Sequence, residues 1–115
     1  MKFGEILKDI GAEGKEKHLP VIEIGKGRGK SDVDVVRVFV GKEVPHPNTV
    51  EHHIAWIELY GVKQDGQVVD LGRAEFAPAF TNPNVRFQVP VEEFKAFCAF
   101  SYCNVHGVWQ NCVEL

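Results

Sequence analysis

Short runs of β-branched and aromatic residues recur along most of this 115-residue chain, and they constrain its fold more than any other feature. Seven runs follow Pro20, and turn-forming sequences such as PHPN, QDGQ, TNPN and NVHG separate several of them. The runs span residues 21–24, 33–40, 54–62, 67–80, 85–89, 94–102 and 108–115. Many short strands without a second helical pattern predict an all-β fold, an immunoglobulin-like seven-stranded antiparallel β-sandwich.

One short helical turn is expected before the first strand. Phe3, Ile6, Leu7 and Ile10 are apolar at helical spacing, and Gly11 follows where a helix would end. The sequence therefore predicts a small amphipathic helix in front of the sandwich.

Length and charge narrow the classes of function. The chain has the ordinary size of one domain, so residues 1–115 are expected to form a single domain. A net charge of −3 is unlike the basic excess of nucleic-acid binders. The start MKFGEILKDIG lacks the apolar core of a secretory signal, and no run approaches the roughly 18–20 apolar residues of a membrane span. We expect a cytoplasmic protein with reduced thiols that binds neither nucleic acid nor membrane.

The segment IGKGRGKS resembles a phosphate-binding loop only in part. That motif requires a glycine where Ile24 stands, and a helix after Ser31 whose N-terminus holds the phosphates. The strand-like sequence VDVVRVFV follows instead. A solvated hairpin turn is therefore predicted here.

The unusual part of the composition is a set of five histidines and three cysteines. They are His18, His46, His52, His53, His106, Cys98, Cys103 and Cys112. Most of the histidines and Cys103 lie at predicted strand ends or in turns, which a sandwich can gather in one region. Successive side chains of a strand point to opposite faces, so we expect only one of His52 and His53 to reach a common metal. Cys98 and Cys112 lie within strands and are interpreted as small buried apolar residues.

Four imidazoles with one thiolate favour redox iron over other metals. Structural zinc usually takes four ligands, and a blue-copper site requires a weak axial Met, whereas the only Met is Met1. Four nitrogen donors and one sulfur can form a square pyramid with an open sixth position. Two alternatives remain: a structural zinc in a binding module, and an electron-transfer centre whose metal positions are all filled. Trp56 and Trp109 are expected in the core, with Trp109 also beside the site.

Three stretches together resemble the superoxide reductase family, in its one-iron neelaredoxin type. These stretches are EKHLP at residues 16–20, HPNTVEHHI at 46–54 and SYCNVHG at 101–107. The similarity extends from about residue 14 to residue 115, and three motifs in the same order make it specific. The four additional cysteines of two-iron relatives are absent. The resemblance therefore implies the iron-binding catalytic domain alone.

The resemblance also implies a role for each residue of these motifs. It implies one non-haem iron per chain, cycling between Fe²⁺ and Fe³⁺ in an Fe(His)₄(Cys) centre. The implied ligands are His18, His46, His52 and His106 around the iron and Cys103 on its axis, which leaves His53 as the bystander. Glu16 would bind the sixth position of the oxidised centre, and Lys17 would place a positive charge beside it.

The activity implied by this resemblance is enzymatic: one-electron reduction of superoxide to hydrogen peroxide. Rubredoxin or a similar small protein would return the electron, and a homodimer or homotetramer is expected. A run of basic residues could attract the anionic substrate although the whole chain is acidic. This run is Lys15, Lys17, Lys26, Arg28 and Lys30. Backbone N–H groups of the NVHG turn are expected to donate hydrogen bonds to the sulfur.

Overall fold

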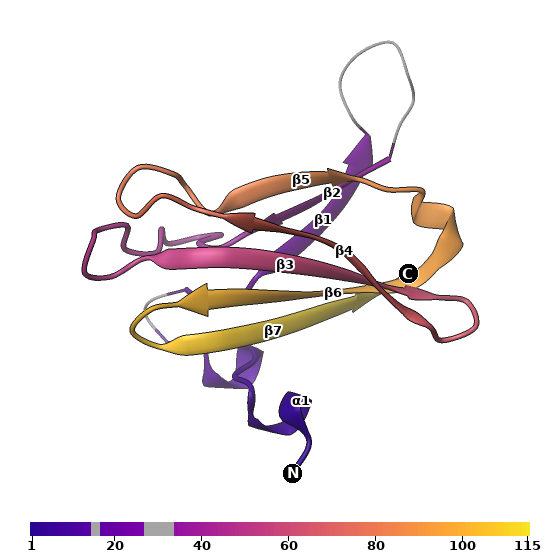
Figure 1. The fold of residues 1–115 in the computed structure, drawn as a ribbon, viewed down its shortest axis with the longest axis horizontal. Helices are drawn as coiled ribbons and strands as arrows, with labels where there is room; N and C mark the ends of the chain where they lie inside the picture. The colour runs from indigo at the N-terminus through magenta and orange to yellow at the C-terminus, as the bar shows by residue number, and fades with distance from the viewer. Residues whose placement is uncertain (15–16, 27–33) are drawn as a thin grey trace.

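The computed structural model describes residues 1–14, 17–26 and 34–115. Within these residues, seven strands form two antiparallel sheets, which confirms the predicted all-β class (Figure 1). The smaller sheet has the order β1 (Val21–Lys26), β2 (Asp34–Phe39) and β5 (Asn84–Gln88). The larger has the order β4 (Val68–Glu75), β3 (Ile54–Lys63), β6 (Phe94–Cys103) and β7 (Gly107–Glu114). This arrangement is an immunoglobulin-type sandwich with the fourth strand in the larger sheet.

The core lies between the two sheets and is built by the alternation of side chains along each strand. Val36 and Val38 face inward from β2, while Ile57 and Leu59 face inward from β3, and all four are fully buried. Phe97 of β6 completes this packed centre. Each such side chain contributes about 1.5–3 kcal/mol on burial, so the strands that flank the histidine-bearing segments are firmly placed.

The fourth strand is shorter than predicted. It ends at Glu75 instead of reaching residue 80, and a turn follows in which Ala79 has a φ of 70°. Pro78 lacks a backbone N–H and so cannot extend the ladder. The Asn48 side chain accepts a hydrogen bond from the Ala79 N–H at 3.0 Å, which ties this turn to the loop between β2 and β3.

The N-terminal helix is also shorter than its apolar spacing predicted. A single turn, α1 (Phe3–Ile6), is followed by a 3₁₀ turn at Ile10–Ala12. Between them the backbone of Lys8 joins β7: its N–H donates to the Val108 carbonyl at 3.4 Å, and its carbonyl accepts from the Gln110 N–H at 2.8 Å. This pairing interrupts the helix. The apolar residues Phe3, Ile6 and Ile10 remain exposed.

The two tryptophans differ in their environments. Trp109 is buried, as predicted, with 3% of its surface exposed. Trp56 is only half-buried, which corrects its assignment to the core. It lies on the outer face of the larger sheet, where its ring packs 5.6 Å from Tyr102 and the Arg73 guanidinium lies 4.3 Å above it. The alternation that turns Ile57 inward turns Trp56 outward.

The connection between β1 and β2, residues 27–33, lies outside the described residues. Its two ends are clear: Lys26 pairs with Asp34 in antiparallel register, so a strand follows the segment, as predicted, where a phosphate loop would require a helix. A second 3₁₀ turn, Val91–Glu93, connects β5 to β6. Among the described residues, no helix is long and apolar enough to cross a membrane.

Candidate metal centre

Three separate parts of the chain bring histidine and cysteine side chains to one end of the sandwich. His18 lies in the stretch that enters β1, His46 and His52 lie between β2 and β3, and Cys103 is the last residue of β6. One ligand atom from each of these four side chains lies within 4.8 Å of the others. Cys103 is fully buried, and His18 and His46 are 5% and 7% exposed. The cluster is therefore shielded from water on most sides.

The imidazoles form a closed ring when His106, from the turn after β6, is included. The ring centroids of His18 and His46, of His46 and His52, and of His18 and His106 are each 4.8 Å apart, and those of His52 and His106 are 5.1 Å apart. Neighbouring rings are inclined by 63° to 85°. His106 Nδ1 lies 3.8 Å from the Cys103 sulfur. Four imidazoles thus surround a small space beside one thiol.

The donor atoms have the spacing that a single metal ion requires. Ligand atoms at 2.0–2.3 Å from one ion lie about 3.0 Å apart when adjacent and at most about 4.6 Å apart when opposite. His18 Nε2 and His106 Nδ1 are 3.0 Å apart. The ligand atoms of His18, His46, His52 and Cys103 all lie within 4.8 Å of one another, close to the upper limit. Imidazole and thiolate donors suit transition metals such as iron, copper and zinc. The residues present therefore fit one transition-metal ion, while the assignment of all five as ligands stays a prediction.

Contacts behind the imidazoles hold them in orientation. His46 Nδ1 lies 2.7 Å from the Pro47 carbonyl, which can only accept, so this nitrogen carries the proton and Nε2 carries the lone pair. The buried hydroxyl of Ser101 donates to the backbone carbonyl of His18 at 2.8 Å. Trp109 stacks on the His18 ring at 4.6 Å with an angle of 10°. Such surroundings fix the direction in which each lone pair points.

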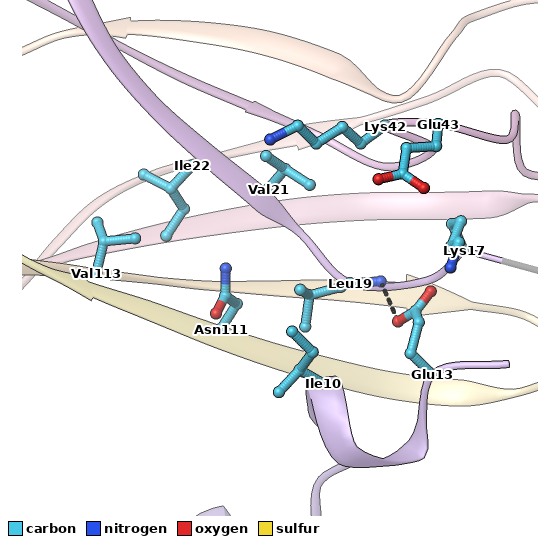
Figure 2. Close-up of a pocket in the computed structure, with 10 residues that line it drawn as sticks. All are labelled: Ile10, Glu13, Lys17, Leu19, Val21, Ile22, Lys42, Glu43, Asn111 and Val113. Carbon is cyan, nitrogen blue, oxygen red and sulfur yellow. Dashed lines mark hydrogen bonds between the residues drawn. The ribbon is translucent and has the colours of Figure 1, made fainter.

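Glu13 fastens the segment that carries His18, a role that no sequence pattern predicted. Its two carboxylate oxygens accept from the backbone N–H groups of His18 at 2.6 Å and Leu19 at 3.1 Å. Figure 2 shows Glu13 reaching Leu19 from the N-terminal segment below β1. No motif links Glu13 to a histidine five residues later. Only the folded path of residues 10–14 brings the carboxylate there.

The turn after Cys103 is tied to the loop that holds His52 by one asparagine. The Asn104 side chain accepts from the His53 N–H at 2.8 Å and donates to the Glu51 carbonyl at 2.9 Å. The backbone N–H of His106 donates to the Cys103 sulfur at 3.3 Å, as expected for this turn. The position of Asn104 directly after the cysteine is the only sequence signal for its role, since asparagine often bonds to nearby backbone in turns.

The remaining predicted site residues fall in different places. His53 turns away from the cluster, and its Nδ1 lies 3.0 Å from the Thr49 carbonyl. Lys17 is half-buried beside His18 and lines a pocket of about 460 Å³ between the N-terminal segment and β1 (Figure 2). Glu16 lies outside the described residues, as do Lys15, Arg28 and Lys30 of the basic run. Lys26 is paired with Asp34 at 2.5 Å.

Two further features place positive charge near the cluster. The Lys8 ammonium donates to the His106 carbonyl at 2.9 Å and lies 5.6 Å from the centre of the Trp109 ring. A second pocket, of about 420 Å³, touches His46 and is lined by Arg37 and Lys42 among others. Lys8 was not singled out in the sequence, because only the pairing of its backbone with β7 brings it to the site.

The interpretation of Cys98 and Cys112 as free buried residues is wrong. The two cysteines form a disulfide, whereas Cys103 is free. They lie directly opposite each other in the register of β6 and β7, on the outer face of the sheet, where Cys98 is half-buried and Cys112 exposed. The spacing of two cysteines along a sequence does not reveal which residues a hairpin places opposite each other, and here the register does so.

Comparison with known proteins identifies the family. A family model described as desulfoferrodoxin matches residues 10–112. The chain belongs to the desulfoferrodoxin family. It is 46% identical to a superoxide reductase of Pyrococcus abyssi over 117 residues, covering 96% of this chain and 99% of that protein. It is 36% identical to the neelaredoxin of Megalodesulfovibrio gigas, with 84% of each chain covered.

Solved structures agree with these relatives. The superoxide reductase (neelaredoxin) from Ignicoccus hospitalis superposes with a TM-score of 0.83 at 35% identity, covering 100% of this chain and 98% of that one. The resemblance inferred from the three sequence motifs is therefore confirmed. Relatives of this desulfoferrodoxin-family chain are superoxide reductases, which are oxidoreductases, and the similarity covers nearly their whole length.

Proposed function

We propose that this chain is a superoxide reductase that reduces superoxide to hydrogen peroxide at one iron held by four histidines and one cysteine. The observation that carries the proposal is the closed ring of four imidazoles beside a buried thiol. Its family supports the same reading, because relatives of similar length bear the name superoxide reductase. The proposed ligands are His18, His46, His52, His106 and Cys103.

The charge of the site favours a small anion. Iron, when bound, supplies the single electron that superoxide takes up. A ferrous ion with one thiolate and four neutral imidazoles has a net charge of about +1, and bound ions dominate the local field. Lys8 adds a positive charge at the His106 carbonyl. Lys17, adjacent to His18 in the chain, is proposed to draw superoxide inward and to orient the water that supplies protons.

Two groups are proposed to control the reactivity of the centre. The His106 N–H that donates to the Cys103 sulfur withdraws electron density from the thiolate, and hydrogen bonds of this kind tune redox potential. Glu16 is proposed to occupy the sixth position when the site is oxidised, as the family resemblance implies.

The electron donor and the surroundings of the protein complete the proposal. Rubredoxin or a similar small redox protein is proposed as the donor, in the cytoplasm. The cytoplasmic location was expected partly on the assumption that all thiols are reduced. That argument no longer applies, because Cys98 and Cys112 form a disulfide. A homodimer or homotetramer is proposed, and the exposed Phe3, Ile6 and Ile10 offer apolar surface for such association.

A visible spectrum combined with pulsed superoxide tests the function. The iron-loaded protein should be blue when oxidised, through charge transfer from the Cys103 thiolate, and should lose this colour on reduction. The reduced form should then regain the colour when superoxide is added. A colourless protein would favour the structural-zinc alternative, and redox cycling without reaction with superoxide would favour electron transfer alone. Cys103→Ser should abolish the blue band.

Lys17→Ala tests the attraction of the substrate. The rate of reaction with superoxide should fall, and the loss should be larger at low ionic strength than at high, because salt screens charge over about 10 Å at 0.1 M. Lys95→Ala is the control, since it removes an exposed lysine near the start of β6, at the opposite end of that strand from Cys103. Equal rates for Lys17→Ala and the native protein would remove Lys17 from the mechanism.

A further inference from the structure

The disulfide between Cys98 and Cys112 lies outside the candidate metal centre and has no part in the proposed reaction. Side chains alternate along β6, and Cys98 stands five residues before Cys103, so the two cysteines point to opposite faces of the sheet. Cys103 is fully buried on the inner face, whereas Cys112 is exposed on the outer face. The paired sulfurs and the metal-site sulfur are therefore chemically separate.

We propose that Cys98 and Cys112 are a second redox site, a reversible dithiol–disulfide pair that hydrogen peroxide oxidises and an external dithiol reduces. The part played by peroxide rests on the proposed function, because peroxide is the product of that reaction. Two features support reversibility: Cys112 is an exposed residue, and it lies on β7, the outermost strand of its sheet. Reagents in solution can therefore reach it.

The pair passes between dithiol and disulfide in two half-reactions. In oxidation, one thiol gives up its proton and its thiolate attacks a peroxide oxygen; the O–O bond breaks, and the leaving hydroxide takes up the proton, so that a sulfenic acid and one water form. The second thiolate then attacks the sulfenic sulfur, which forms the S–S bond and releases a second water. In reduction, a thiolate of the external dithiol attacks Cys112 and displaces the Cys98 thiolate. The second thiol of the reductant then attacks the reductant's own sulfur in this mixed disulfide. This step releases the Cys112 thiolate and leaves the reductant as an intramolecular disulfide.

The position of the bond gives it a mechanical consequence for the metal centre. Cys98 and Cys112 are 14 residues apart, and Cys103 and His106 both lie in the hairpin between them. Closing a loop of this size shifts the folding equilibrium by about a hundredfold in favour of the folded chain. The oxidised pair therefore links β6 and β7, the two strands of the hairpin. The tip of this hairpin carries the Cys103 sulfur and the His106 imidazole.

Counting free thiols tests the proposal on the metal-loaded protein. Samples are alkylated with iodoacetamide in denaturant, and the adducts are located by mass spectrometry. The oxidised protein should carry one adduct, on Cys103. After native-state incubation with dithiothreitol it should carry three, and after a later addition of hydrogen peroxide it should carry one again. Cys112→Ser, as the matched control, should carry two adducts before and after dithiothreitol, and peroxide should form no intramolecular disulfide in it.

Each alternative result overturns the proposal. If dithiothreitol opens the bond only in denaturant, the disulfide is a permanent structural link. If peroxide leaves three adducts, the pair is not a peroxide-oxidised couple. If reduced and oxidised protein unfold at the same urea concentration, the bond does not fasten the hairpin. Both reagents are added directly and without turnover, so a failed superoxide assay with an intact thiol cycle would count against the proposed function alone.

Discussion

Glu13→Gln is the sharpest test of how the chain positions the first histidine of the site. The carboxylate accepts two backbone N–H groups, those of His18 and Leu19, with its two oxygens. Glutamine has nearly the same shape but only one oxygen. One N–H group would keep its acceptor, and the other would face an amide NH₂ that can only donate.

The magnitude follows from the loss of one charge-assisted hydrogen bond. Such bonds contribute about 1.5–3 kcal/mol, and an unsatisfied buried donor costs a similar amount. Because the site is partly buried, we expect the free energy of unfolding to fall by about 2 kcal/mol. With a urea m-value of about 2 kcal/mol/M for a small domain, the midpoint should move by about 1 M.

Urea unfolding and the visible spectrum of the iron-loaded protein measure this change. We expect the lower midpoint together with a shifted or weakened blue band, since His18 would be held less firmly. Glu5→Gln is the control: Glu5 is an exposed carboxylate in α1, and its substitution should change stability by less than about 0.5 kcal/mol. A Glu13→Gln protein with native stability and a native spectrum would refute the positioning role.

Substitutions at three further positions test other contacts. Asn104→Asp keeps the acceptor and loses the donor, so the free energy of unfolding should fall by about 1 kcal/mol. Asn104→Ala loses both and should lower it by about 2 kcal/mol, and urea unfolding should rank the two variants in that order. The Glu58 carboxylate raises the pKa of Tyr60 to about 12, chiefly by accepting its hydrogen bond. That stability is present below pH 10 and is lost as the pH rises through about 12. Tyr60→Phe should therefore flatten the pH dependence of unfolding in this window, and an unchanged slope would contradict the assignment. Gly61→Ala should destabilise by about 1–3 kcal/mol, since the added Cβ would lie 2.6 Å from the Phe94 ring; a native melting temperature would show that this ring moves aside freely.

The strands were predictable because their apolar alternation is a local pattern. The motifs that carry the histidines were predictable for the same reason. The choice between His52 and His53 rested on strand alternation, but β3 begins at Ile54 and both histidines lie in the loop before it, so it is the loop that directs His52 to the cluster. What the sequence did not reveal depends on contacts between distant segments. The N-terminal helix was overestimated because its apolar spacing is local, whereas the pairing of Lys8 with β7 is made across nearly the whole chain.

The supporting residues of the site were missed for a related reason. Glu13 and Ser101 act on His18 through its backbone, and backbone bonding leaves no pattern in side-chain types. The disulfide was missed because its two cysteines become neighbours only through the register of one hairpin. Glu16 could be assigned only through the family resemblance, and it stays a prediction.

The pairing of Lys8 with β7 has a consequence for how separate copies of the molecule meet. β7 is the last strand of its sheet, and a bare outer strand presents unpaired N–H and carbonyl groups on which another chain can build. Lys8 occupies part of this edge with two backbone hydrogen bonds and places its charge beside it. Removing the first nine residues would uncover a strand that can template aggregation. The N-terminal segment therefore protects solubility as well as placing a lysine near the metal centre.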